Sequence, residues 1–486
     1  MALRARQAHL LGYDTYCDYI LEDRMVQSLP NLRRFMDDLK AAVLPKAQSE
    51  LKELSEIIVC SDSSDCDIMP WDVSYLSEKL KQQRYHFDSE QLRPYFPLDA
   101  VREGIFNLYN RLYGLHFEED SNIPVYHEEV RVYHVLDGER EMGLLYLDMH
   151  PRPSKRSGAW MTEFRGQYGK VRPQIQVVCN FSKPTADTPS LLRFSEVETF
   201  MHEMGHAMHG MLSDVQYESL SGTNVKRDFV EMPSQVMENW CYEPEFLATF
   251  AHHYQTGAPL PTEYIEKIRA AQNHLAGWLC LRQLNLGMTD ITFHTMQIEN
   301  GKLKIENSAD ADNNSQFSIL NSQFKMENGK LKIENSADAD NNSQFSILNS
   351  QFKIENGKLK IENSADADNN SQFSILNSQF MAEAVEAAAM TNLLPRVEGC
   401  CTATNFSHIF GGGYASGYYG YKWAEVLDAD IFSRFKADGI FNQETATSFR
   451  HEILSRGGTE HPAVLFRNFM GREPDNQALL KRMNLL

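Results

Sequence analysis

Two histidines four residues apart, in the stretch HEMGH that runs from His202 to His206, constrain the fold of this chain more than any other feature. Residues four apart lie on one face of an α-helix, so a helix presents both imidazoles to a single tetrahedral metal ion and places Glu203 beside them. Ser195, ahead of the motif, is a good N-cap residue. Apolar side chains then recur with helical spacing: Phe200, Met204, Met208 and Leu212. The sequence therefore predicts a buried, amphipathic, metal-binding helix.

A third metal ligand is available in Glu231, which lies far enough beyond His206 for a second helix to fold back on the first. Two histidines, one carboxylate and an open position for water make up a catalytic zinc site, in which Glu203 is placed to take a proton from the water. By itself, Glu231 has an alternative interpretation as a solvated helix carboxylate, which the neighbouring HEMGH motif makes the weaker of the two. We therefore predict one Zn²⁺ per chain, bound by His202, His206 and Glu231.

The sequence does not decide which side chains orient the ligand histidines. A metal-bound histidine usually donates its other N–H to a carboxylate or carbonyl group, and Asp228, Gln235 and Glu238 are all near Glu231 in the chain. A fourth protein ligand would close the position that water needs, so we assign His209 to packing. The pattern also leaves open whether cobalt or manganese replaces zinc.

A second segment with chemical potential is the stretch HIFGGGYASGYYGYKW, which begins at His408. Three consecutive glycines weaken a helix and permit close backbone approach or hinge motion, as in a loop that closes around a ligand. The lysine and hydroxyl residue of a phosphate-binding loop do not follow them. Tyr414, Tyr418 and Tyr421 share one face if this segment is helical. Such a stripe is more often core packing, but the adjoining glycines favour a binding loop.

These motifs follow one another in an order that is seen in one known family. Together with stretches such as GLLYLDMHPRPSKRSGAWM and FRHEILSRGGTEHPAVLFRNFMGREP, the segments HEMGHAMHGML, SGTNVKRDFVEMPSQVMENW and HIFGGGYASGYYGYKWAEVL cover nearly all of the chain outside one insertion. On these motifs the chain resembles the family of thimet oligopeptidase, oligopeptidase A and dipeptidyl carboxypeptidase. The resemblance implies a zincin-like catalytic region and a zinc-dependent metallopeptidase that hydrolyses short peptides.

The resemblance also implies a role for each matching residue. The zinc ligands are then His202, His206 and Glu231. Glu203 matches the general base, and His408, Tyr414 and Tyr421 match residues that contact the substrate and support the transition state. Zinc together with a phenol or imidazole donor can stabilise the negative charge that forms on a peptide carbonyl oxygen. The resemblance is divided between oligopeptidases that cut internally and peptidyl-dipeptidases that release C-terminal dipeptides, so this choice stays open.

Composition and charge narrow the class of partner. The 486 residues are 42% hydrophobic and 23% charged, which are ordinary values for a globular enzyme with an ample core. The formal net charge of −19 disfavours nucleic-acid phosphates as partners. No segment has the apolar length that spans a bilayer, and the N-terminus lacks a secretory signal. Since the eight cysteines form no C-x-x-C pair, we expect a cytoplasmic protein with reduced thiols and neither membrane nor nucleic-acid partners.

Periodic patterns predict a mainly α fold. Helical patterns cover 2–56, with interruptions expected at Pro30 and Pro45, and they return from 195 to 296 and again from 381 onwards. Most of the chain on either side of the predicted metal helix is therefore expected to be helical.

Short β-rich runs between 124 and 183, among them VRVYHVL, GLLYLDM and IQVVCNF, predict a small β-sheet next to the zinc helix. An edge strand of this sheet could hold an extended peptide by main-chain hydrogen bonds. The expected regions are a helical one at 1–123, the sheet with the zinc-binding helices at 124–296, an insertion at 297–380, and the helical C-terminal part with the Gly/Tyr loop at 381–486.

The insertion consists of three near-identical 28-residue copies, at 297–324, 325–352 and 353–380. Each copy carries an Asn-Gly pair between alternating residues, which can at most form a hairpin. The copies contain too few apolar residues to share a core, so we expect a largely disordered surface excursion. Because the cost of closing a loop grows slowly with its length, such an excursion need not unfold the rest of the chain.

The chain also departs from the family pattern on its N-terminal side. Family members carry a long helical region that forms the opposite wall of a substrate channel, whereas this chain begins near the middle of the family pattern. We therefore expect that an N-terminal fragment is missing or is supplied by a partner. The alternative to an active peptidase is an inactive or unstable truncated remnant that keeps the zinc site without the full channel.

Overall fold

The computed structural model describes residues 1–58, 68–85, 89–299, 302–304, 323–327, 330–334, 353–355, 358–360, 382–383, 385–387, 389–397 and 399–486. These residues form two compact units, each built from segments that are distant in sequence. Unit 1 combines residues 1–37 with 282–419, and unit 2 combines residues 38–281 with 420–486. The four consecutive regions expected from the sequence stay a prediction.

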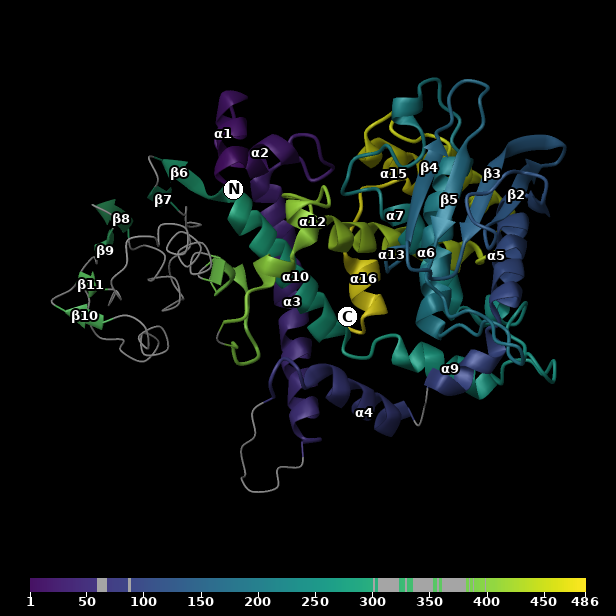
Figure 1. Ribbon diagram of the computed structural model, residues 1–486, viewed down its shortest axis with the longest axis horizontal. Coiled ribbons are helices and arrows are strands. Elements are labelled where there is room, and N and C mark those ends of the chain that lie inside the picture. Colours follow the sequence, from purple (N-terminus) through teal and green to yellow (C-terminus); the bar gives the residue numbers. More distant parts are fainter. Residues whose placement is uncertain are drawn as a thin grey trace. The chain divides into compact units, whose positions relative to one another are not determined.

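A five-stranded sheet in unit 2 confirms the small sheet predicted next to the metal helix (Figure 1). Its strands, in spatial order, are β1 (Leu115–Glu119), β2 (Arg131–Asp137), β3 (Arg140–Asp148), β5 (Gln174–Val178) and β4 (Trp160–Arg165). β3 and β5 run parallel, and the other neighbours are antiparallel. Gly138, with φ of +60°, makes the tight turn between β2 and β3. β4 is the end strand, and its outer edge pairs with no strand among the described residues.

The predicted metal helix is α6 (Phe194–Met211), and it packs against β3, β4 and β5. Its N-cap is Arg193 rather than Ser195, because the Glu196 side chain accepts a hydrogen bond from the Arg193 backbone N–H at 2.7 Å. A β-carbon placed on Gly210 would lie 2.7 Å from the Ile175 side chain of β5. Glycine at this position therefore lets the helix approach the sheet closely.

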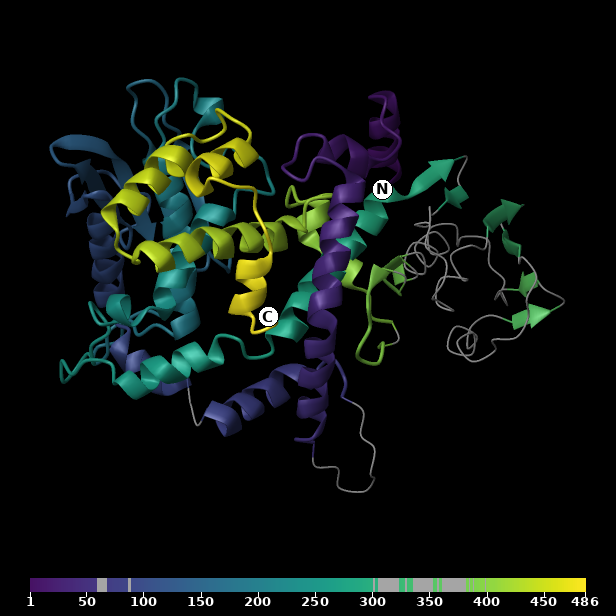
Figure 2. The same ribbon diagram turned by 180° about the vertical axis from the view of Figure 1, so that it is seen from behind.

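Within the described residues, nine further α-helices lie wholly in unit 2. They are α4 (Val73–Tyr85), α5 (Leu98–Tyr113), α7 (Met232–Glu238), α8 (Pro244–Leu247), α9 (Thr262–Ala271), α13 (Gly420–Asp438), α14 (Gln443–Phe449), α15 (Pro462–Met470) and α16 (Gln477–Arg482). α13 packs on both α7 and α16, and Figure 2 brings the yellow C-terminal helices α13 to α16 to the front. An aromatic cluster fills the space around α13: Trp240, Phe432, Phe435, Phe449 and Phe469.

Two long helices contribute residues to both units. α3 (Leu29–Ser55) continues through Pro45, so the interruption expected there is wrong, whereas the helical pattern is broken at residues 22–28, next to Pro30, as expected. Pro30 lies in the first turn, where the missing N–H leaves no helical hydrogen bond unmade. Inside unit 2, a β-carbon on Gly277 of α10 (Ala276–Thr295) would lie 2.8 Å from the Ala47 backbone nitrogen. This glycine lets α10 lie directly against α3.

Unit 1 contains α1 (Ala2–Leu10), α2 (Tyr16–Leu21), α12 (Ser407–Phe410) and the unit 1 portions of α3 and α10. Asp290 of α10 is fully buried, and its carboxylate accepts backbone N–H bonds from Ser416, Gly417 and Tyr418 at 2.9, 2.9 and 3.0 Å. This carboxylate therefore holds the turn that follows the three glycines.

The described parts of the insertion are short strand pairs around the Asn-Gly positions. They are β6 (Gln297–Glu299) with β7 (Lys302–Lys304), β8 (Gln323–Glu327) with β9 (Lys330–Glu334), and β10 (Lys353–Glu355) with β11 (Lys358–Lys360). All three pairs are antiparallel, as a hairpin requires. The rest of the expected surface excursion lies outside the described residues.

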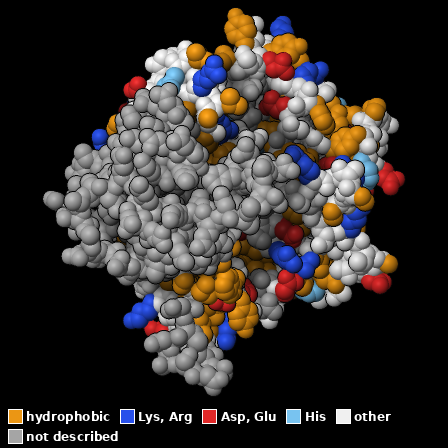
Figure 3. All heavy atoms as spheres, turned by 60° about the vertical axis from the view of Figure 1, so that its left-hand side comes forward, with side chains coloured by type: hydrophobic (Ala, Val, Ile, Leu, Met, Phe, Trp, Pro, Cys, Tyr) orange, Lys and Arg blue, Asp and Glu red, His pale blue; other side chains and the backbone are white. Residues whose placement is uncertain are grey.

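The surface of the described part is mixed in character. On the face drawn in Figure 3, acidic and basic side chains are interspersed outside the grey atoms, and apolar side chains lie between them. Among the residues that the structure describes, no helix combines the length with the apolar character that crossing a bilayer requires.

Candidate metal centre

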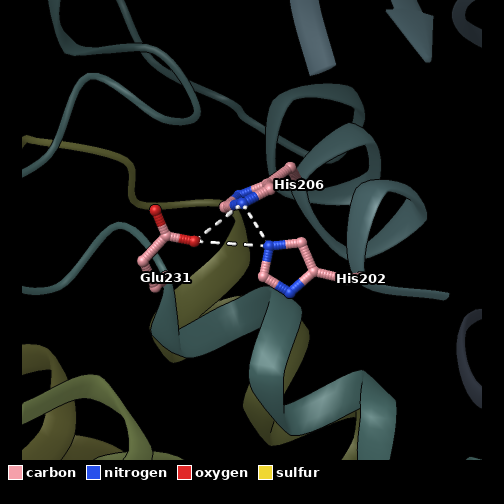
Figure 4. A group of neighbouring side chains, drawn as sticks. All are labelled: His202, His206 and Glu231. Carbon is pink, nitrogen blue, oxygen red and sulfur yellow. Dashed lines mark hydrogen bonds and ion pairs between the residues drawn. The ribbon is translucent and has the colours of Figure 1, made fainter. Parts of the chain in front are cut away.

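Three side-chain atoms converge at one point on α6 and α7 (Figure 4). His206 Nε2 lies 3.1 Å from His202 Nε2 and 3.1 Å from Glu231 Oε2, and His202 Nε2 lies 3.3 Å from Glu231 Oε2. Ligands about 2.0–2.1 Å from a tetrahedral zinc ion stand roughly 3.3 Å from one another. The three atoms therefore have the mutual spacing of zinc ligands, and they form the one cluster of this kind within the described residues.

The close packing of α6 and α7 brings the third ligand to the two histidines. A β-carbon on Gly205 would lie 2.5 Å from the Cα of Ser234, so only glycine permits this approach. Glu231 is the N-cap residue of α7, and its backbone carbonyl accepts a hydrogen bond from Ser234 Oγ at 2.7 Å. Glu231 is 6% exposed. Its carboxylate is therefore held inside the protein and faces the imidazoles.

Glu238 is the group that orients His202, a choice that the sequence left open. Its Oε1 lies 2.6 Å from His202 Nδ1, on the opposite side of the ring from the predicted metal. Gln235 instead donates its side-chain N–H to the Tyr421 backbone carbonyl at 3.4 Å. A carboxylate at Nδ1 fixes the tautomer that leaves Nε2 free for a metal and makes it a stronger ligand.

Without a metal, this cluster shifts the pKa values of its own members. Burial lowers the pKa of His202, but its bonds to Glu231 and Glu238 outweigh burial and raise it well above the usual value. Burial raises the pKa of Glu231, but the two imidazoles outweigh it and hold that pKa well below the usual range. The buried Nδ1 of His206 has no hydrogen-bond partner among the described residues. The donor set and its negative carboxylates thus fit a divalent cation such as Zn²⁺.

Glu203 follows His202 on α6 and is 7% exposed. Burial raises its pKa, while the neighbouring His202 and His206 oppose that shift. Both Glu203 and His202 line a cavity of about 450 Å³, together with Ala159 and Thr199. A buried carboxylate with a raised pKa beside a cavity is suited to accept and return a proton.

His209 lies one turn after His206 and is fully buried. Burial lowers its pKa to about 3, so its ring is neutral. Neither ring nitrogen has a hydrogen-bond partner among the described residues, and His209 lies outside the converging group. These observations agree with the packing role assigned from the sequence.

The other predicted site residues are divided between the two units. His408 and Tyr414 lie in unit 1, with their ring centroids 6.1 Å apart, and His408 also lies 5.7 Å from the Tyr418 ring. Tyr421 lies in unit 2, in the first turn of α13, where its carbonyl accepts the hydrogen bond from Gln235. The roles of His408, Tyr414 and Tyr421 stay predictions.

Tyr414, Tyr418 and Tyr421 do not share one face of a helix, so that interpretation of their spacing is wrong. α13 begins at Gly420, so Tyr414 and Tyr418 precede it in an irregular turn. Ser416, at the centre of this turn, has φ of +53°, in the left-handed region. The buried Asp290 carboxylate holds the turn, and no signal around Asp290 in the sequence pointed to this partner. Ala159 was missed as well, although it directly precedes a β-rich run.

Comparison with known proteins places the chain in a peptidase family. The profile of Peptidase family M3 matches residues 1–334 and 359–485, so the chain belongs to this family. It is 35% identical over 493 residues to oligopeptidase A of Escherichia coli (strain K12), covering 100% of this chain and 61% of that protein. It is 31% identical over 487 residues to dipeptidyl carboxypeptidase of the same organism, covering 99% of this chain and 60% of that protein. The chain thus spans about three fifths of the length of these relatives.

A solved structure with a similar fold is the M32 carboxypeptidase from Deinococcus radiodurans R1. The TM-score is 0.50 at 13% sequence identity, and the alignment covers 99% of this chain and 71% of that one. This similarity concerns the fold alone. The family expected from the sequence motifs and the mainly α fold with a small sheet are both confirmed.

Proposed function

We propose that this chain is a zinc-dependent metallopeptidase that hydrolyses peptide bonds of short peptides. The observation that carries the proposal is the convergence of His202, His206 and Glu231 at zinc-ligand spacing, with the buried Glu203 next to them. Membership of Peptidase family M3 supports the same conclusion. The names of its relatives, oligopeptidase A and dipeptidyl carboxypeptidase, support internal cleavage or the release of C-terminal dipeptides.

Each of the converging residues has a distinct task in this proposal. His202, His206 and Glu231 would hold the zinc ion, which when bound supplies Lewis-acid activation of water and of the substrate carbonyl. Glu203 takes the proton from the attacking water and passes it to the departing amine nitrogen, since its raised pKa suits both transfers. Glu238 keeps the His202 ring in the ligand orientation through the bond at Nδ1.

A peptide substrate can add to the sheet as a further strand. β4 is the end strand, and Ala159, directly before it, lines the same cavity as His202 and Glu203. Main-chain hydrogen bonds to an edge strand hold an extended peptide with little regard to its side chains. We propose His408, Tyr414 and Tyr421 as the donors that stabilise the charge on the carbonyl oxygen in the transition state.

The test is cleavage of a quenched peptide about ten residues long by the purified, zinc-loaded protein, with zinc content measured in parallel. Activity should be lost on chelation, return with zinc, and be lost in Glu203→Gln while zinc stays bound. Glu266→Gln, which removes an exposed carboxylate on α9, is the matched control. Product masses distinguish dipeptide release from internal cuts. A folded, zinc-loaded protein that does not cleave the peptide would contradict the proposal and favour an inactive remnant.

A further inference from the structure

Two exposed aromatic rings, together with the Tyr146 ring that is only 8% exposed, form a platform beside the outer end of β4. Phe164 of β4 lies 5.3 Å from Tyr146 of β3 and 6.3 Å from Tyr126, and both pairs are edge-to-face. Phe164 and Tyr126 are each 50% exposed. We call Tyr126, Tyr146 and Phe164 the aromatic platform. Two half-exposed apolar rings grouped around a buried one are typical of binding sites rather than of ordinary surface.

The platform is rigidly held. Tyr126 donates its phenolic O–H to Asp148 Oδ2 at 2.8 Å and also contacts the Gln176 side-chain amide. Asp148 is 1% exposed, and Arg152 binds both of its oxygens at 2.9 Å while stacking over the Tyr126 ring. Side chains that are already ordered lose little entropy when a ligand covers them, so the platform is prepared for binding.

The position of the platform connects it to the candidate metal centre. Ala159 lines the cavity that also contains His202 and Glu203, and β4 runs from the next residue to Arg165. An extended chain advances about 3.3 Å per residue, so a peptide that pairs with β4 reaches Phe164 roughly five residues after Ala159. The register shift in β4 after Glu163 makes this distance approximate by one residue.

The two faces of β4 differ in what they offer a peptide. Glu163 points toward α6, where its Oε1 lies 2.8 Å from the β-carbon position of Gly210. Phe164 points to the opposite face, toward Tyr146 and Tyr126. A peptide strand beside β4 alternates its side chains between these faces, so only every second one can meet the platform.

We propose that the aromatic platform is a specificity subsite, which binds an aromatic or large aliphatic side chain of the peptide about five residues from the bond that is cut. This inference rests on the proposed peptidase function and adds to it a preferred class of substrate. Peptides that are too short to reach Phe164 gain nothing from the subsite. Longer peptides with an apolar residue at that distance bind more tightly.

The experiment measures the affinity of peptides whose register is fixed by a hydroxamate, a chelating group that anchors one end at zinc. Two series, with the hydroxamate at the carboxyl end or at the amino end, sample both directions along the strand. Each series moves a single Phe through a Ser/Ala peptide. In one series, Phe about five residues from the anchor should tighten binding to the zinc-loaded protein on the order of tenfold over Ser, and Phe at the adjacent positions should not.

Substitutions of Phe164 test whether the preference for Phe comes from the aromatic platform. Phe164→Ser should abolish the preference for Phe, and Phe164→Leu should keep part of it. Tyr75→Ser, which removes an exposed aromatic ring on α4, should leave the preference unchanged. Affinity for a hydroxamate peptide of three residues should be the same in all variants, which also shows that they are folded and bind zinc.

The outcomes distinguish failure of the proposed subsite from failure of the proposed peptidase function. If all hydroxamate peptides bind equally well and the zinc-loaded protein still cleaves the quenched peptide, the subsite does not exist while the peptidase function stands. A Phe preference that survives Phe164→Ser overturns the assignment to the platform. If the zinc-loaded protein binds none of the hydroxamate peptides, both the subsite and the peptidase function are refuted.

Discussion

Replacing Gly205 with alanine tests whether the packing of α6 on α7 builds the metal centre. The new β-carbon would lie 2.5 Å from the Cα of Ser234, whereas ordinary contacts are 3.4–4 Å, so α7 must move by about 1 Å. Alanine favours a helix over glycine by about 1 kcal/mol, and overpacking costs roughly 1–3 kcal/mol, so the net change in the free energy of unfolding is small or moderately unfavourable. Stability alone is therefore a weak test.

Zinc affinity is the sharper measurement. Glu231 lies one turn before Ser234, and metal–ligand distances tolerate changes of only about 0.2 Å. A shift of about 1 Å should thus weaken zinc binding by more than 10-fold, because changes in residues that merely orient a ligand already cost 10–100-fold. Competition with a fluorescent zinc chelator gives the dissociation constant.

A matched control separates loss of the ligand from general destabilisation. Gly104→Ala on α5 introduces a similar clash, since its β-carbon would lie 2.5 Å from the Phe250 ring, but it touches none of the predicted zinc ligands. This variant should lose stability and keep wild-type zinc affinity. Unchanged zinc affinity in folded Gly205→Ala would refute the reasoning that this contact sets the position of Glu231.

Three further predictions concern carboxyl groups. Glu238→Gln should weaken zinc binding by about 10- to 100-fold and leave the fold intact, since an amide orients the His202 ring without the charge; zinc competition and circular dichroism check both parts. Asp148→Asn should lower the free energy of unfolding in urea by roughly 3–5 kcal/mol, because the buried side chain of Lys155 and the half-buried Arg152 lose their common anionic partner; a change as small as that of Glu266→Gln would contradict this. Burial, with a smaller contribution from Glu218, raises the pKa of Glu163 from 4.5 to about 7 in the folded protein, so its contribution to stability is complete below pH 4.5 and disappears as the pH rises through 7. Glu163→Gln should flatten that part of the stability curve, and an unaltered slope would exclude Glu163 as its source.

Local patterns in the sequence predicted those features that depend on residues a few positions apart. The spacing of His202 and His206 specifies a shared face on a helix, and alternating apolar residues specify the strands of the sheet. The Asn-Gly pairs likewise predicted hairpins, and β6 with β7, β8 with β9 and β10 with β11 are antiparallel pairs. These predictions succeeded because backbone geometry alone decides them.

Predictions failed where distant packing outweighed a local preference. Pro45 was expected to interrupt a helix, yet α3 continues through it as part of a long packed helix. Tyr414 and Tyr418 have helical spacing, but Asp290, far away in the chain, captures the backbone N–H groups of this segment and holds it as a turn. A buried carboxylate bonded to three N–H groups outweighs helix propensities of a few tenths of a kcal/mol per residue.

The sequence by itself predicted His202, His206 and Glu231 as the metal ligands, and it determined the helix that carries the two histidines, the small sheet and the family to which the chain belongs. Only the tertiary structure decided that Glu238, and neither Asp228 nor Gln235, holds His202, and that an aromatic platform stands at the outer end of β4. The physical reason is that helical spacing follows from the backbone of one segment, whereas a side-chain partner depends on the angle and distance at which two segments pack. At α6 and α7 that distance is set by a contact that only a glycine allows.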